Sequence, residues 1–390
     1  MLFEVNNPIK NEIVLSSEVE KDEITEKISN AFDYKFDGKI ETIIKIPKFP
    51  EEFNIGLIVG SSGSGKSTLL KLFGNTEIIN WNNEKSIASH FENFEEASKR
   101  FGAVGLNSIP TWLKPYRVLS NGEKFRADVA RKLHSGAVID EFTSVVNREC
   151  AISCSVSISK YIKNNNLKNI VFASCHDDII NFLEPDWVYD TDKNELSVGR
   201  YLCKRPSVVL EVNQSTKQIW YLFEKYHYLS SELNGAADCY VFTWNKLLVA
   251  FGAIIPMPGK FGDDTRNCVS EHRIVVLPDY QGMGFGNKIS EYLGELYLSQ
   301  GYRYFGKTAN PRMGEHRERS NKWRATSSNL KLIGIKDLDN IKTRPLGRNK
   351  TRESVINTLT RLCYSHEYIG DENTYIGENK LHKNNSKKLF

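Results

Sequence analysis

The sequence lacks long apolar runs and paired cysteines. No hydrophobic stretch in its 390 residues approaches the roughly 18 residues that a membrane-spanning helix requires, and runs such as Ile55–Val59 have the length of a strand. The seven cysteines are odd in number and include no C-x-x-C pair. We therefore expect no membrane span, no disulfide framework and no structural zinc site.

The N-terminus and the overall charge also exclude some functions. The first residues, MLFEVNNPIKNEIV, lack the basic segment, apolar core and small-residue cleavage site of a secretion signal, so we expect a cytoplasmic protein. A net charge of +4 does not by itself indicate a nucleic-acid partner, although Lys and Arg concentrate after about residue 300. The length predicts two or three domains.

Apolar patterning changes along the chain. Up to about residue 50, apolar and polar residues alternate, which predicts a small antiparallel sheet. From there to about residue 190, short apolar runs are separated by polar segments of helix length, a pattern typical of a parallel α/β sheet. A second α/β unit is predicted from Val208 to about Ile333, with a helix over Lys217–Tyr228. The expected domains are 1–200, 201–345 and a C-terminal extension, 346–390, whose last ten residues we expect to be disordered in isolation.

A phosphate-binding loop follows the first apolar run. Ile55–Val59 leads into GSSGSGKST at Gly60–Thr68, and a helical pattern comes next. The glycines allow backbone N–H groups to converge on phosphate oxygens at a helix N-terminus. Lys66 would reach the β- and γ-phosphates of ATP, and the Ser67 hydroxyl would bind magnesium. The residues predicted to hold the nucleotide are Gly60, Ser61, Gly63, Gly65, Lys66, Ser67 and Thr68.

Three further segments follow in order. Residues 119–123 read LSNGE and precede an amphipathic helix. The strand predicted at 137–139 ends in Asp140, which would hold magnesium through water, and Glu141, which would act as general base toward an attacking water. His176 follows another predicted strand. Taken singly, LSNGE could be a helix cap and His176 a structural histidine.

Together the four segments resemble the ABC ATPases over residues 1–195. The resemblance implies that His176 contacts the γ-phosphate. It also implies that Ser120 and Gly122 of one copy cap the ATP bound by another, so we expect a homodimer. Asn147 stands where the family has an aspartate that contacts the partner subunit, which leaves communication between the two ATP sites in doubt.

No Q-loop glutamine is evident, and the segment before LSNGE is short for a transporter, so export is not expected. Soluble members of the family act mostly on nucleic acids or ribosomes, and this analogy favours such a partner.

A second glycine-rich turn lies in the C-terminal half. A strand predicted over 273–276 leads into QGMGFG at 281–286 and then into a helix, an order that suits a pyrophosphate. The string resembles the acetyl-CoA motif of the GNAT acyltransferases, and the resemblance covers about 207–330. A simple tight turn is the alternative. The residues implied to bind acetyl-CoA are Val275, Val276, Gln281, Gly282, Met283, Gly284 and Gly286.

The GNAT resemblance also implies a bulge in the strand before this turn, where exposed backbone positions the thioester. Glu271 and His272 lie at the start of that strand, so either could be the base for an attacking amine. Tyr280 and Tyr304 are weaker proton donors. The alternative for Glu271 is a solvated charge at a strand end.

A basic cluster follows the next predicted strand. Arg312, Arg317, Arg319 and Trp323 suit phosphate contacts with base stacking, and a solvated basic face is the alternative. A GNAT-like domain with such a region resembles the phage Mom-type DNA-modification proteins and the ABC–GNAT fusions of mobile elements. That resemblance implies a nucleobase acceptor, with DNA favoured, and a base in a duplex would have to be flipped out.

The predicted fold class is α/β, with an ABC ATPase domain, made of a P-loop parallel sheet and a small antiparallel sheet, before a GNAT-like mixed-sheet domain. The first functional hypothesis is an ATP-hydrolysing ATPase coupled to a transferase that uses acetyl-CoA, or a related acyl-CoA, to modify a nucleic-acid base. A GNAT acetyltransferase of a protein or small-molecule amine is the second. A non-catalytic, ATP-gated nucleic-acid clamp is the third.

Overall fold

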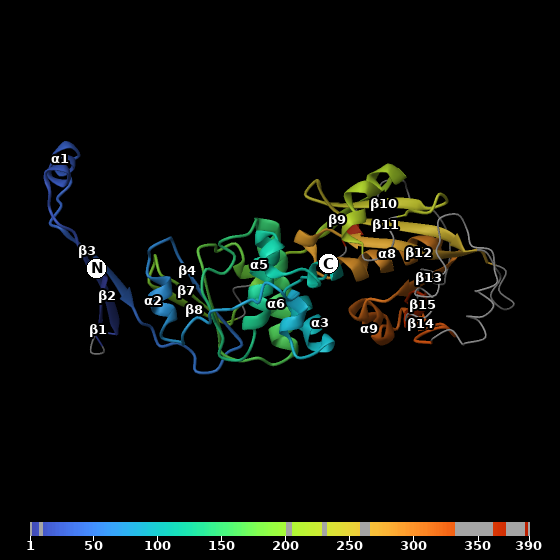
Figure 1. Ribbon diagram of the computed structural model, residues 1–390, viewed down its shortest axis with the longest axis horizontal. Coiled ribbons are helices and arrows are strands. Elements are labelled where there is room, and N and C mark those ends of the chain that lie inside the picture. The colour runs from blue at the N-terminus through green and yellow to red at the C-terminus, as the bar shows by residue number, and fades with distance from the viewer. Residues whose placement is uncertain are drawn as a thin grey trace. The chain divides into compact units, whose positions relative to one another are not determined.

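The structure is a computed structural model (Figure 1). Its described residues are 2–7, 11–199, 205–227, 232–257, 266–331, 362–371 and 387–388. The predicted boundaries at 200 and 345, together with Cys203, lie outside them. No helix among these residues is both long and apolar enough to cross a membrane.

The chain forms two compact units. The first comprises Met1–Pro206 together with Pro278–Met283, and the second comprises Ser207–Leu277 and Gly284–Phe390. The short segment Pro278–Met283 thus packs with the N-terminal half of the chain, although its neighbours in sequence on both sides belong to the second unit.

The main sheet of the first unit has five strands in the order β5-β6-β4-β7-β8. The first four in this order are parallel, and β8 forms an antiparallel hairpin with β7. Residues of β4 and β6 are buried throughout, because helices cover both faces of a parallel sheet and its strands are continuously apolar. The parallel sheet predicted from these runs is confirmed. The strands are β4 (Ile55–Val59), β5 (Val138–Ile139), β6 (Ile170–Ser174), β7 (Trp187–Asp190) and β8 (Glu195–Val198).

The N-terminal sheet is antiparallel, as predicted, and consists of β1 (Leu2–Asn7), β2 (Glu12–Glu18) and β3 (Lys39–Lys45). Helix α1 (Glu23–Ala31), which was not predicted from the sequence, connects β2 to β3. It begins with a capping box at Asp22 and buries none of its residues. Its formation therefore depends on local capping rather than on packing against the unit.

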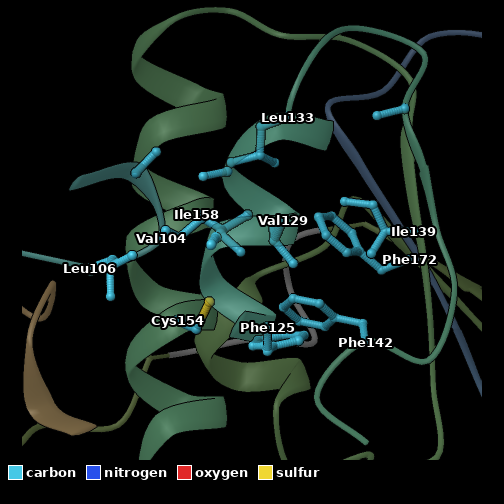
Figure 2. Close-up of a cluster of buried hydrophobic side chains, with 14 of the residues drawn as sticks. Val104, Leu106, Phe125, Val129, Leu133, Ile139, Phe142, Cys154, Ile158 and Phe172 are labelled. Carbon is cyan, nitrogen blue, oxygen red and sulfur yellow. The ribbon is translucent and has the colours of Figure 1, made fainter. Parts of the chain in front are cut away.

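The helices of the first unit enclose an apolar core with one face of the sheet. Figure 2 shows side chains from α5 and α6 meeting Ile139, Phe142 and Phe172, which come from the sheet and the loop after β5. The helical elements are α2 (Lys66–Leu70), η1 (Ile87–His90), α3 (Phe94–Ala103), α4 (Ile109–Trp112), η2 (Tyr116–Val118), α5 (Asn121–Lys132), α6 (Arg148–Asn164), α7 (Ile180–Leu183) and the 3-10 turn η6 (Pro278–Tyr280).

The second unit is built on an eight-stranded sheet in the order β14-β15-β13-β12-β11-β10-β9-β16. Among the described strands of this sheet, only β12 and β13 pair in parallel. Helix α8 (Phe285–Ser299) packs against these two strands, and α9 (Pro311–Arg319) follows β13 (Figure 1). The strands are β9 (Val209–Ser215), β10 (Asp238–Trp244), β11 (Leu247–Met257), β12 (Cys268–Val276), β13 (Arg303–Thr308), β14 (Trp323–Ala325), β15 (Tyr364–Tyr368) and β16 (Lys387–Lys388).

The structure differs from the sequence prediction at two places in this unit. The helix predicted over Lys217–Tyr228 is instead two 3-10 segments, η4 (Lys217–Leu222) and η5 (Glu224–Tyr226), and Tyr228 is not described. Side chains three residues apart eclipse in 3-10 geometry, so Trp220 and Phe223 are both buried against the sheet.

The C-terminal region also contributes to this sheet. β15 pairs with β13 and β14, beyond the predicted boundary at 345. β16 pairs with β9, inside the tail that we expected to be disordered in isolation. The remainder of that tail lies outside the described residues. The predicted α/β fold class, with its parallel and small antiparallel sheets followed by a mixed sheet, is confirmed.

Candidate active sites

The first candidate site is the loop between β4 and α2. Gly63 and Gly65 have φ values of 81° and 87°, a left-handed conformation that glycine adopts without steric cost. A Cβ atom on Gly65 would overlap the Ile44 side chain, whereas one on Gly63 would meet nothing within 4 Å. Gly65 therefore brings the start of α2 close to β3, while the space above Gly63 is open to a ligand.

Polar groups of this loop are paired within the protein. The Lys66 ammonium donates to the carbonyl oxygens of Gly60 (2.9 Å) and Ser61 (2.6 Å). The backbone N–H of Ser61 and its hydroxyl each donate to the Asp192 carboxylate, both at 2.7 Å. Ser67 is exposed at the start of α2. Asp192, in the hairpin between β7 and β8, was not singled out from the sequence, because only the sheet order brings it to the loop.

The predicted ATPase side chains lie at one edge of the sheet. Lys66 follows β4, Asp140 and Glu141 follow β5, and His176 follows β6, and these three parallel strands are neighbours. The carboxyl ends of parallel strands share an edge, where ligands of α/β folds bind. Glu141 is exposed with a left-handed φ of 50°, and its N–H donates to Asp140 Oδ1 at 2.8 Å.

His176 is anchored to the segment that follows Glu141. Its Nδ1 lies 3.2 Å from the Thr143 hydroxyl. Burial and the nearby Arg148 charge lower the pKa of His176 below its usual value, so the imidazole is neutral at pH 7. A neutral ring with one nitrogen near a hydroxyl can donate a hydrogen bond to a phosphate oxygen.

Ser120 forms the helix cap that was the alternative for the LSNGE segment. Its hydroxyl accepts from Glu123 N at 3.3 Å, and Glu123 Oε2 accepts from Ser120 N at 2.9 Å. Burial tends to raise the pKa of Glu123, but hydrogen bonds from Ser120 and Thr111 lower it overall. Ser120 is exposed and Gly122 half-buried, and the Ser120 hydroxyl also donates to Glu123 Oε2 at 3.0 Å, a bond with which a second molecule would compete.

The second candidate site surrounds β12. Its pairing with β11 shifts register: Ala253 faces Arg273 and Ile254 faces Glu271, so His272 is an extra residue. This is the bulge that the GNAT resemblance implied. Pairing with β13 ends at Ser270, so the two parallel strands are joined over only their first residues.

The strand then leads through the glycine-rich turn to α8. Gly284 precedes this helix with a left-handed φ of 90°, and Val275 and Val276 end β12. A parallel pair whose pairing ends just before a bulge, followed by glycines at a helix N-terminus, suits an extended ligand with a terminal phosphate.

Residues 207–316 match the acetyltransferase (GNAT) family. The matched GNAT domain runs from β9 into α9 and contains both the bulge and the glycine-rich turn. No curated protein matches the chain.

Solved structures similar to parts of the chain include acetyltransferases and an ABC cassette. A Bacillus subtilis acetyltransferase in complex with CoA is 14% identical, with a TM-score of 0.28, over 42% of this chain and 98% of the other. A GNAT acetyltransferase from Elizabethkingia anophelis with acetyl-CoA bound is 14% identical, with a TM-score of 0.26, over 40% and 94%. MJ0796, a bacterial ABC transporter cassette solved as a dimer, is 15% identical, with a TM-score of 0.30, over 40% and 89%.

Glu271 of the GNAT domain is a buried ion-pair member and not a solvated strand-end charge. Its carboxylate accepts from the Tyr304 hydroxyl at 3.0 Å, from the Ser290 hydroxyl, and from Arg317 Nη2 at 2.6 Å. The side chains of Arg317 and Glu271 are 1% and 6% exposed. Both carboxylate oxygens are thus engaged, which leaves Glu271 poorly placed to take a proton from a substrate.

His272, the bulged residue, accepts a hydrogen bond at Nε2 from Asn234 N at 3.1 Å. Burial and the adjacent Arg273 charge lower the pKa of His272 to about 4. A base with so low a pKa is a poor acceptor for the proton of an ammonium group. His272 thus orients the bulge better than it serves as a general base.

The predicted nucleic-acid contacts require correction at two positions. Arg317 is buried against Glu271, and Trp323, 6% exposed, lies under its guanidinium at 4.2 Å, so neither side chain is presented to a nucleic acid. The missing side chain at Gly306 provides the room for this arginine. Arg319 is 77% exposed beside Glu315, and Arg312 is half-buried. Arg317 and Arg319 are thus each paired with a carboxylate, Glu271 on β12 and Glu315 on α9.

Gly286 lies in the first turn of α8, and the other residues predicted to bind acetyl-CoA, Gln281, Gly282 and Met283, lie in the segment that packs with the first unit. The Gln281 side chain accepts from Asn107 N at 2.9 Å. Gly282 has a φ of 94°, and a Cβ atom there would overlap the Ser157 hydroxyl. These contacts come from segments distant in sequence, the loop before α4 and helix α6, and no local pattern indicated them.

Proposed function

We propose that the chain is an ABC-type ATPase coupled to a GNAT transferase that takes its acyl group from acetyl-CoA. The observation that carries the transferase is the bulge at His272 in the family-matched stretch, beside a parallel strand pair that ends at Ser270. The ATPase rests on Lys66, Glu141 and His176, which follow three adjacent parallel strands at one sheet edge.

The P-loop residues fit a triphosphate. The open space above Gly63 and the amides at the start of α2 would receive the phosphates. The Lys66 ammonium, now paired with two carbonyl oxygens, would exchange them for phosphate oxygens. Ser67 and Asp140 would hold Mg²⁺, which neutralises phosphate charge when bound. Glu141 would accept the proton of the attacking water, and His176 would donate to the γ-phosphate.

In the GNAT domain, the backbone at the bulge would orient the thioester carbonyl, and the amides at Gly284 and the start of α8 would hold the pyrophosphate. Acyl transfer joins the acceptor amine to the acyl carbon as the carbon–sulfur bond breaks, and the amine's proton passes to the departing thiolate. Because Glu271 and His272 are both engaged by protein donors, we propose that the amine enters already deprotonated.

A nucleobase amine, DNA favoured, is the acceptor that we propose first, on the Mom-type resemblance. Of the four residues predicted to contact nucleic acid, Arg312 and Arg319 retain accessible surface. The burial of Arg317 and Trp323 favours the second candidate, an amine of a protein or small molecule.

The decisive experiment incubates the full chain with radiolabelled acetyl-CoA, ATP, Mg²⁺ and DNA, RNA, protein or polyamine acceptors. Label in a nucleoside adduct, identified by mass spectrometry and lost in Gly284→Asp, supports the first acceptor, and label in protein or polyamine supports the second. Salt-sensitive, ATP-dependent DNA binding without any transfer would support the third hypothesis, a non-catalytic nucleic-acid clamp.

The ATPase assignment is tested by ATP affinity. Lys66→Ala should lose ATP binding while the exposed Lys85→Ala retains it. Equal affinities of the two variants would refute the ATPase assignment.

The homodimer is tested separately. Ser120 is exposed and would cap the ATP that a second copy binds. Glu141→Gln should therefore retain ATP and form a dimer on gel filtration with ATP and Mg²⁺. A monomer under these conditions would refute the shared site.

A further inference from the structure

The segment Pro278–Met283, called the CoA turn below, is held by residues of α5, of α6 and of the loop before α4. The Ser153 hydroxyl on α6 donates to the carbonyl oxygen of Asp279 at 2.7 Å. The Asn147 amide, at the start of α6, donates to the Asp279 carboxylate at 3.0 Å. Together with the Asn107 bond to Gln281, these contacts fix the turn at both its main chain and its side chains.

A buried arginine on α5 strengthens this arrangement. Arg126 is 3% exposed, and its guanidinium donates to Gly105 O at 2.7 Å and to the Ser153 hydroxyl at 2.8 Å. It also reaches the carbonyl oxygens of Asp279 and Gln281, at 3.4 and 3.5 Å. A buried cation needs such acceptors, so the carbonyl groups of the CoA turn complete the solvation of an arginine that lies six residues after Ser120.

A short strained segment joins Asn147 to the predicted ATP site. It begins at Glu141, and both Glu141 and Thr143 have left-handed φ values, 50° and 70°. Thr143 is fully buried and β-branched, so this conformation is unfavourable and is maintained by its surroundings. One of these surroundings is His176, whose Nδ1 faces the Thr143 hydroxyl. A ligand that moves His176 or Glu141 therefore acts on a segment that ends at Asn147.

We propose that Asn147 and Arg126 are positioning residues for the CoA turn, through which nucleotide at the ATP site alters the affinity for acetyl-CoA. This inference rests on the proposed function, because it requires both ligands to bind. Coupling between two sites is reciprocal: ATP must change acetyl-CoA affinity by the same factor as acetyl-CoA changes ATP affinity. Typical coupling corresponds to a factor of about 5 to 150.

The test measures acetyl-CoA affinity of the full chain by calorimetry, with and without a non-hydrolysable ATP analogue and Mg²⁺. The informative variant is Asn147→Asp. It keeps the side-chain oxygen that caps α6 at Cys150 N, but it replaces the donor to Asp279 with a second carboxylate oxygen. Asp279→Asn in the same chain restores a donor–acceptor pair with the roles exchanged. Asn164→Ala, at the exposed far end of α6, is the matched control.

We expect the analogue to change acetyl-CoA affinity at least fivefold in the unaltered chain and in Asn164→Ala, less than twofold in Asn147→Asp, and at least fivefold again in the double variant. A change under twofold in the unaltered chain overturns the coupling while the proposed function stands. Full coupling in Asn147→Asp refutes the role of Asn147. Absence of any acetyl-CoA binding refutes the proposed function itself.

Discussion

Loss of the Arg317 guanidinium should strongly destabilise the GNAT domain, because it would leave the Glu271 carboxylate buried beside an apolar side chain. Arg317 donates to Glu271 at 2.6 Å and to Ser290 at 2.9 Å, and stacks over Trp323. Removing one member of a buried ion pair costs about 3–5 kcal/mol. For Arg317→Met, which retains much of the side-chain volume, we expect a loss in this range.

Thermal unfolding of the full chain, followed by circular dichroism with urea titration alongside, measures this effect. For a domain of this size each kcal/mol lowers the melting temperature by roughly 2–4 °C, so the transition of the GNAT domain should fall by roughly 6–20 °C. The double variant Arg317→Met, Glu271→Gln removes both charges and should recover part of the loss. A single-variant loss below about 1 kcal/mol would contradict the argument, because that is the value of an exposed pair.

Three further predictions concern the other sites. Asp192→Asn removes the negative charge beside Ser61, where the phosphates of ATP would bind. ATP binding measured by calorimetry should therefore tighten by about twofold to fivefold, the effect of one exposed charge. Weaker binding would mean that Asp192 organises the loop. Because the pKa of His272 is about 4 when folded and 6.5 is its ordinary value, the unfolded chain binds more protons between these pH values, and stability should rise across them. His272→Gln should flatten that rise in urea titrations, and an unchanged slope would assign it to other groups. Ser120→Ala should destabilise the chain by about 1 kcal/mol through the lost cap and also reduce ATPase activity, whereas Ser120→Asn should restore only the stability; restored activity would exclude a catalytic contact for the hydroxyl.

Much of the architecture could be predicted because it is encoded locally. Continuous apolar runs predict buried parallel strands such as β4 and β6, and the order of strand, GSSGSGKST and helix predicts the glycine-rich loop before α2. Elements that depend on distant chain segments could not be predicted in the same way. β15 joins the sheet from far along the sequence, and no period within it indicates its partner.

The candidate sites show the same division. Sequence order alone predicts that Lys66, Glu141 and His176 follow strands, and the strand order brings these strands together. Sequence could not predict that Arg317 faces inward, because that orientation depends on the space above Gly306 and on a carboxylate 46 residues away. Charged residues on one helix can therefore be counted from sequence, but whether they face solvent is decided by tertiary packing.

The position of α1 has a practical consequence for handling the protein. Ile24, Ile28 and Phe32, on α1 and at its C-terminal cap, are 66%, 53% and 78% exposed, so they form an apolar stripe that favours self-association. The pairing of β2 with β3 does not depend on α1, because it ends with Glu18 opposite Lys39. The intervening loop can thus be replaced by a two-residue hairpin turn without disturbing the ladder register. Such a shortened chain would retain both compact units and expose less apolar surface in crystallisation trials.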